Sequence, residues 1–166
     1  VPTTGSGALI SDDTPPPTAD SQAYIPSGRP GSRAPHVWLR PSAGLESRPA
    51  GMGLLHGEPE TARISTLDLF DTGFTLLTGP DGKTWRDVGS QMARALAIPF
   101  AAFAVGAAGD FDEVEGNWAD LYGVDAGGAV LVRPDGHVGW RSRGSATEPQ
   151  KVMRTALATV TRRRAP

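Results

Sequence analysis

Proline is distributed unevenly along this chain of 166 residues, and the distribution limits where a core can form. Residues 1–60 contain ten of the 15 prolines, including the run Thr14-Pro15-Pro16-Pro17, which predicts polyproline II. Proline fixes φ, removes a backbone donor and favours extended backbone in the residue before it. We therefore predict that residues 1–61 are an extended docking or linker segment, either disordered or laid over another surface. Within it, Val37-Trp38-Leu39 predicts a short strand that docks.

From Ser65 onward the apolar residues recur regularly, and we predict one folded domain over residues 62–166. Apolar residues alternate with polar ones at 65–70 and recur at 73–78, so both stretches are expected to be strands. The unbroken apolar run at 100–105 is typical of a strand that is covered on both faces.

Helical spacing and end signals predict the helices that join these strands. Thr84 opens the first helix, with Asp87 three residues later as the partner in a capping box, and Pro99 ends it. A short helix is expected at 113–122, with Gly123 as its stop.

The C-terminal part reads as a hairpin followed by a helix. Residues 129–133 and 137–141 flank Pro134-Asp135-Gly136, which suits a tight turn because proline fixes the first corner and glycine allows a positive φ. Thr147 and Gln150 predict a capping box at the start of the last helix.

The order of these elements predicts an α/β fold. An apolar strand that follows a helix implies a parallel crossover, and the hairpin and the final helix complete a layered sheet. We expect a thioredoxin-like mixed sheet flanked by helices, preceded by the extended segment rich in proline and glycine.

Composition narrows the classes of partner. The chain has no cysteine, which excludes a disulfide, a thiolate nucleophile and a cysteine metal ligand. Its net charge of -2 gives no long-range attraction to nucleic acid or to an anionic membrane. No apolar run approaches the roughly 18 residues of a membrane span, and no secretory leader is visible, so a cytoplasmic protein is expected. Because the sequence begins with Val1-Pro2 rather than methionine, we expect a piece of something longer.

Two glycine-containing motifs resemble cofactor sites, but each lacks a required element. Gly79-Pro80-Asp81-Gly82-Lys83-Thr84 lies between a strand and a helix, yet Leu77 occupies the position of the first glycine that a phosphate-binding loop needs. Gly5-Ser6-Gly7-Ala8-Leu9-Ile10 begins like a dinucleotide fingerprint, but the third glycine and the following helix are missing. No GxSxG elbow is present. We therefore predict no catalytic and no cofactor-binding residue in this chain.

Histidines and carboxylates do not form a metal site by their spacing. His36, His56 and His137 are not placed as a metal pair, and no nearby carboxylates complete a site. The acidic cluster, which lacks the spacing of a calcium loop, consists of Asp110, Asp112, Glu113 and Glu115. A solvated loop and a helix N-terminus explain it better, and a structural hydrogen bond explains His36 better than catalysis does.

Six short stretches occur in an order and spacing that is fairly specific. They are PGSRAPHVWL at 30–39, STLDLF at 65–70, GFTLL at 73–77, YGV at 122–124, AVLVRPDG at 129–136 and VGWR at 138–141. Together they resemble the C-terminal part of FAD-dependent aromatic-ring monooxygenases, in particular hydroxylases of phenols and aromatic polyketides. The resemblance covers nearly the whole chain, and residues 7–10 look like the last strand of the preceding module.

The resemblance implies a cysteine-free thioredoxin-like domain whose parent enzyme hydroxylates aromatic substrates with FAD, NAD(P)H and oxygen. In that family an upstream module holds flavin and substrate, so no cofactor is expected in this chain. The implied role is an accessory, non-catalytic domain, either a fragment or a separate subunit, that packs against the flavin module. Residues 31–39 would then lie at the joint between the modules, and our hypothesis is that Arg33, His36 and Trp38 hold that joint.

Two other interpretations remain open from the sequence. The chain could be an independent cysteine-free thioredoxin-like module that binds another protein, or an enzyme that acts through His36 and the acidic cluster. A homo-oligomer is also possible.

Overall fold

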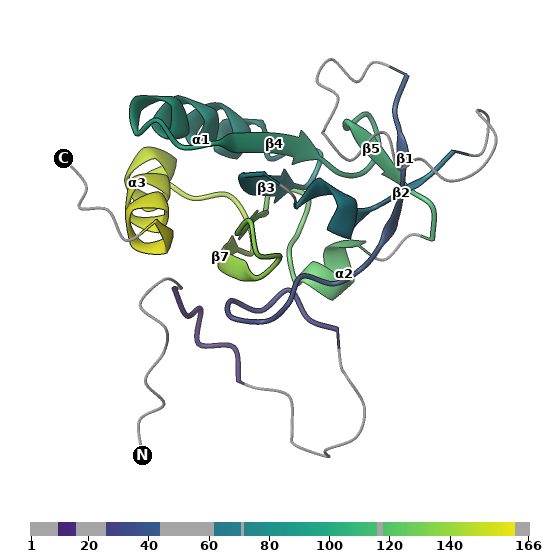
Figure 1. The fold of residues 1–166 in the computed structure, drawn as a ribbon, viewed down its shortest axis with the longest axis horizontal. Coiled ribbons are helices and arrows are strands. Elements are labelled where there is room, and N and C mark those ends of the chain that lie inside the picture. Colours follow the sequence, from purple (N-terminus) through teal and green to yellow (C-terminus); the bar gives the residue numbers. More distant parts are fainter. Residues whose placement is uncertain (1–9, 16–25, 44–61, 71, 116–117, 162–166) are drawn as a thin grey trace.

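The computed structural model describes residues 10–15, 26–43, 62–70, 72–115 and 118–161 (Figure 1). Its elements in chain order are β1 (Trp38–Pro41), β2 (Ile64–Ser65), the 3-10 helix η2 (Thr66–Leu69), β3 (Phe74–Thr78), α1 (Lys83–Ala95), β4 (Phe100–Ala104), β5 (Phe111–Glu113), α2 (Trp118–Tyr122), β6 (Ala129–Val132), β7 (Val138–Ser142) and α3 (Pro149–Val160).

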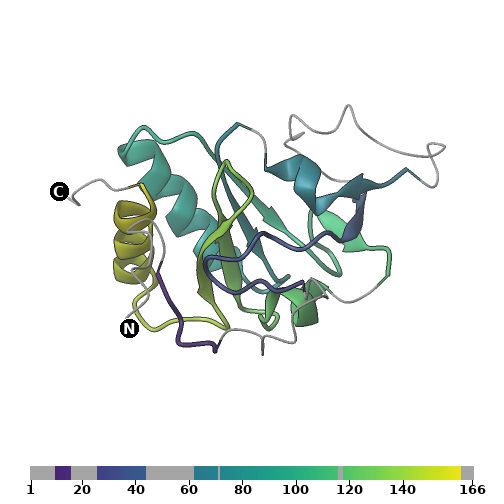
Figure 2. The same ribbon diagram turned by 60° about the horizontal axis from the view of Figure 1, so that its bottom comes forward.

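A mixed four-stranded sheet with the order β4-β3-β6-β7 forms the centre of the fold. β3 and β4 run parallel because α1 connects them, as a crossover requires. β6 and β7 form an antiparallel hairpin around a turn in which Gly136 has φ +79°. Figure 2 shows α1 and α3 together on one side of this sheet.

A second, three-stranded sheet lies at the other side, with the antiparallel order β2-β1-β5 (Figure 2). Leu39 of β1 faces Ile64 of β2 and Glu113 of β5 across the two ladders. The described part of the proline-rich segment therefore supplies the central strand of this sheet.

Alternation along the central strands divides the apolar side chains between two cores. Leu76 and Leu131 point toward α1 and α3, where they pack with Trp85, Trp140 and Met153. Leu77 and Val130 point the other way, into a core shared with the small sheet, η2 and α2. Leu76, Leu77, Val130 and Leu131 are all fully buried, which is why these strands read as continuous apolar runs.

The α/β class is confirmed, with a mixed sheet flanked by helices. The strands predicted at 73–78 and 100–105, the hairpin and the final helix are confirmed within a few residues. The thioredoxin-like name remains a prediction from the order of the elements. The division of the chain at residue 61 also remains a prediction. Ala34, Val37 and Leu39, which precede it, share one core with residues that follow it.

The strand predicted at 65–70 is wrong, because these residues form β2 only to Ser65 and then η2. The Ser65 side chain accepts from the backbone of Leu67, and the Asp68 carboxylate accepts from the backbone of Ser65 at 3.1 Å. This reciprocal cap starts a tight helical turn, and it outweighs the strand preference of the alternating pattern.

The helix predicted at 113–122 is also wrong in its first half. Residues 111–113 form β5, because Phe111 is fully buried and its segment pairs with β1. Among the described residues of this stretch, helix is found at Trp118–Tyr122, and Gly123 ends it with φ +68° as expected. β4 is an edge strand whose first three residues are half-buried, so it is not covered throughout on both faces.

Both predicted capping boxes are absent from the described helices. α1 begins at Lys83 after Gly82, without a side-chain cap, and Asp87 pairs with Lys83 at 2.5 Å instead. α3 begins at Pro149 after Glu148, again without a side-chain cap. Proline suits the first helical turn because its missing N–H needs no partner there.

Candidate functional site: the joint cleft

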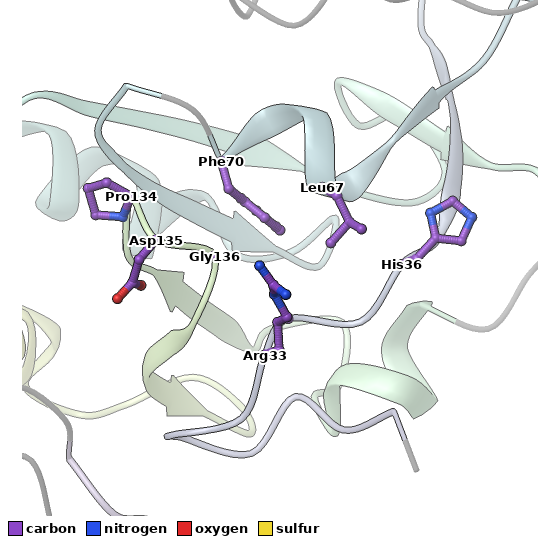
Figure 3. Close-up of a pocket in the computed structure, with 8 residues that line it drawn as sticks. Arg33, His36, Leu67, Phe70, Pro134, Asp135 and Gly136 are labelled. Carbon is purple, nitrogen blue, oxygen red and sulfur yellow. The ribbon is translucent and has the colours of Figure 1, made fainter. Parts of the chain in front are cut away.

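An open cleft of about 740 Å³ lies where three segments meet, and it contains two of the residues predicted at the joint. Its lining, shown in Figure 3, consists of Arg33, Ala34, His36, Leu67, Phe70, Pro134, Asp135 and Gly136. These residues come from the segment before β1, from η2 and its end, and from the β6–β7 turn. We call this hollow the joint cleft.

Backbone pairing fixes the segment that carries Arg33 and His36. Arg33 forms an antiparallel bridge with His137, and the Ala34 N–H donates to the Gly136 carbonyl at 2.9 Å. The Pro35 carbonyl accepts from the hydroxyls of Tyr122 at 2.6 Å and Thr66 at 2.8 Å. Arg33 and His36 thus project from a backbone that the rest of the domain holds in place.

The His36 ring is held on one side and exposed on the other. Its Nδ1 lies 2.6 Å from the Ser65 hydroxyl, and its edge packs against Trp38 with ring centroids 4.7 Å apart. Arg63 lies over the Trp38 ring, with its guanidinium carbon 4.2 Å from the centroid, a cation–π arrangement. Trp38 does not line the cleft but adjoins it through His36. The predicted structural hydrogen bond of His36 is confirmed.

Asp135 is the carboxylate that lines the cleft, and its charge has partners within the domain. It pairs with Arg133 at 2.5 Å and accepts from the backbone N–H of His137 at 3.2 Å. Burial raises the pKa of Asp135, but the hydrogen bond from His137 and the charge of Arg133 outweigh it and hold the pKa below its ordinary value. Asp135 therefore remains an anion that needs no further partner.

Arg33, in contrast to Asp135, has no described partner for its charge. Its side chain is exposed and, among the residues that the structure describes, no carboxylate lies within ion-pair distance of it. Figure 3 shows its guanidinium directed toward Leu67 and Phe70. Leu67 is 45% exposed, the only large apolar side chain so exposed in the described ranges, whereas Phe70 is buried at 7%. The cleft thus offers an apolar floor beside a cation that has no carboxylate partner in the described structure.

Of the three residues predicted at the joint, Arg33 and His36 line the cleft and Trp38 lies beside it, but the sequence did not indicate the apolar half of the cleft. Leu67 and Phe70 were assigned to a strand, and only the Ser65–Asp68 spacing of a capping box could have indicated the turn that exposes Leu67.

The loop at 79–84 does not fit a flavin or nucleotide phosphate. A phosphate cradle needs free backbone N–H groups, but the N–H groups of Gly79, Asp81 and Gly82 donate to the carbonyls of Gly128, Ala126 and Gly79 at 2.9–3.1 Å. The other glycine motif, at residues 5–10, lies outside the described residues except for Ile10.

The described residues contain neither a candidate metal site nor a helix that could span a membrane. They contain no cluster of three or more histidine, aspartate or glutamate side chains that could hold a metal. The Asp110 carboxylate accepts from the Ala104 N–H at 2.7 Å, so it has a structural role in the acidic cluster. His56 lies outside the described residues. No described helix is long and apolar enough to cross a membrane.

Comparison with known proteins agrees with the resemblance found in the sequence. The family described as "Aromatic-ring hydroxylase, C-terminal" matches residues 49–163. A 4-methyl-5-nitrocatechol 5-monooxygenase from Burkholderia sp. is 38% identical over 80% of this chain and 21% of its own length. Aklavinone 12-hydroxylase RdmE from Streptomyces purpurascens is 37% identical over 93% of this chain and 25% of its own.

Among solved structures, the ternary complex of aklavinone-11 hydroxylase with FAD and aklavinone superposes with a TM-score of 0.73 at 32% identity. The match covers 95% of this chain and 26% of the hydroxylase. This chain thus spans only about a quarter of the length of the relatives that it matches. It belongs to the family of aromatic-ring hydroxylase C-terminal domains.

Proposed function

We propose that this chain is the accessory, non-catalytic C-terminal domain of an FAD- and NAD(P)H-dependent aromatic hydroxylase, and that it packs against the flavin and substrate module. The observation that carries the proposal is the family match over residues 49–163, together with relatives of which the chain spans about a quarter. One such relative was solved with FAD and aklavinone. FAD and the aromatic substrate then belong to the other three quarters of the parent.

The joint cleft is the surface through which we propose that the two modules meet. Arg33 and His36 present polar groups on a fixed backbone, Trp38 and Arg63 extend the surface beside them, and Leu67 adds apolar area. An apolar centre with charged groups around it is the usual composition of an interface between protein surfaces. An exposed apolar side chain next to an unpaired cation gains from a partner that covers both.

Flavin titration of this chain tests the non-catalytic part of the proposal. Flavin fluorescence should show no tight binding to this chain, whereas the full-length parent should hold FAD. Tight binding to this chain alone would mean that the cofactor site has been misplaced. Saturable turnover by this chain that disappears in His36→Ala would instead make it an enzyme.

Replacement of Arg33, His36 and Trp38 by alanine in the full-length parent tests the joint. We expect faster proteolytic cleavage between the modules, because an undocked domain exposes the connecting chain. A matched control replaces Lys83, Lys151 and Arg154, three exposed cations on the helices of the opposite side of the sheet. Equal cleavage rates in both triple variants and the wild type would remove these residues from the joint.

A further inference from the structure

Arg141 is a buried cation whose contacts reach two segments that are distant in sequence. Arg141 as a whole residue is 7% exposed, although it lies on β7, at the edge of the four-stranded sheet. Its Nε donates to Asp12 Oδ2 at 2.7 Å, and its Nη2 contacts the same oxygen and donates to the Thr14 hydroxyl at 2.7 Å. Its Nη1 donates to the Tyr122 carbonyl at 2.9 Å. All three nitrogens of the guanidinium are therefore engaged.

The segment at residues 10–15, which we call the entering segment, is fastened at a second point. The Ile10 N–H donates to the Gly139 carbonyl at 3.0 Å, and the Ile10 side chain packs against the core beneath α1 and α3. The entering segment thus follows β7 from Gly139 to Arg141.

Tyr122 carries the connection from Arg141 to the joint cleft. Its carbonyl accepts from Arg141, and its hydroxyl donates to the Pro35 carbonyl, directly between Ala34 and His36 of the cleft. Tyr122 is fully buried and its ring stacks on Trp118. A buried hydrogen-bonded network of this kind restricts its members to one arrangement. The entering segment is therefore connected, through Arg141 and Tyr122, to the backbone segment that carries Ala34 and His36 of the cleft.

We propose that Arg141 is a positioning residue, which fixes the orientation of the joint cleft relative to the entering segment through Tyr122. The inference rests on the proposed function, because the orientation matters where both surfaces face the same flavin module. With the network intact, the domain docks in one orientation. Without it, the entering segment separates from β7 and the docked orientation is no longer unique.

Distance measurement by pulsed electron resonance on the full-length parent tests this proposal. One spin label replaces Arg154, which is exposed on α3, and the second occupies an exposed position of the flavin module. The wild type should give one narrow distance peak. A broad wild-type distribution would contradict the proposed function itself, because the domain would then not be docked.

Asp12→Asn and Arg141→Met should both lose the narrow peak while circular dichroism shows the wild-type content of helix and strand. Asp12→Glu retains the charge and should restore the peak. If Arg141→Met does not fold, the test rests on Asp12→Asn. This variant is expected to fold because Asp12 is only partly buried. A narrow peak that persists in Asp12→Asn overturns the proposal and leaves the proposed function standing.

Two controls separate positioning from general destabilisation. Arg143→Met removes an exposed neighbour that also donates to the Thr14 hydroxyl, at 3.2 Å, but forms no hydrogen bond with Asp12 or Tyr122 in the described structure. Gly106→Ala destabilises the turn after β4 through its positive φ of +117° and lies neither in the network nor in the joint cleft. Both variants should retain the narrow peak. If either one loses it, the effect of Arg141→Met reflects a loss of stability, and Arg141 is not a positioning residue.

Discussion

Arg141 and Asp12, 129 residues apart in the sequence, form an ion pair in which the arginine side chain is 4% exposed and the carboxylate 18%. Burial raises the pKa of Asp12, but hydrogen bonds from Thr14 and Arg141, and the charge of Arg141, outweigh it and hold the pKa below its ordinary 3.8. The pair is thus a contact between the first described residues of the chain and the edge of the central sheet.

Asp12→Asn should lower the free energy of unfolding by about 2 kcal/mol at neutral pH, because a charged hydrogen-bond partner of Arg141 is lost. A depressed folded pKa means that this stabilisation is complete above the ordinary pKa of 3.8 and disappears as the pH falls through the lowered value. The difference between wild type and variant, measured by urea unfolding across that range, should therefore shrink in acid. Asp13→Asn is the control, since Asp13 is exposed and asparagine tolerates its φ of +59°.

Gly123→Ala should destabilise the domain more than Gly136→Ala. Both glycines have positive φ, which costs a residue with a Cβ about 1–2 kcal/mol. A Cβ at Gly136 meets nothing within 4 Å, whereas at Gly123 it lies under 3.0 Å from Nη1 of Arg141. Gly123→Ala must therefore also displace the buried guanidinium of Arg141. Equal unfolding midpoints in urea would contradict this ranking.

Tyr122→Phe should cost about 1 kcal/mol, the usual net value of one hydrogen bond, because the Pro35 carbonyl keeps its bond from Thr66. Thr66→Val should cost more, since the Thr66 hydroxyl also accepts from the Val37 N–H at 3.0 Å. The double variant leaves the Pro35 carbonyl with neither hydroxyl. Its loss of unfolding free energy should exceed the sum of the single losses, and a double-mutant cycle measures the excess.

Leu67→Ser should leave the stability of the domain within about 0.5 kcal/mol of wild type, because Leu67 is exposed. Phe70→Ala, three residues later and buried, should cost about 3–5 kcal/mol. Both changes alter the apolar side of the joint cleft, but only Leu67→Ser separates docking from folding. In the full-length parent it should speed proteolysis between the modules while thermal unfolding of the domain stays unchanged.

Local sequence signals predicted the elements that depend on neighbouring residues. Pro134-Asp135-Gly136 fixed the hairpin because each residue suits one corner of the turn. The apolar run at 129–132 and the helical spacing after Pro149 were equally readable. A strand covered on both faces leaves an unbroken apolar run, and an amphipathic helix leaves apolar residues at helical spacing. The resemblance in six short stretches led to the family, which the comparisons show.

The same signals failed at two places, one decided by a competing local cap and one by pairing with a distant strand. Alternation at 65–70 predicts a strand, but the Ser65–Asp68 cap turned it into η2. The charged residues at 112–113 predict a solvated helix start. They lie in β5 instead, because Phe111 beside them is buried and the segment pairs with β1. In each case a local pattern fitted two structures; the Ser65–Asp68 cap selected the first outcome and the pairing with β1 selected the second.

Arg33, His36 and Trp38 were identified from the sequence as residues of one segment, but only tertiary structure placed Leu67, Phe70 and the β6–β7 turn against them. Nothing in the sequence pairs Asp12 with Arg141, or Tyr122 with Pro35. Their contacts depend on how the two sheets and α2 pack, and a hydrogen bond between residues far apart in the chain leaves no periodic pattern in it. The sequence thus determined the family and most of the elements, whereas packing decided the cleft and the network that holds it.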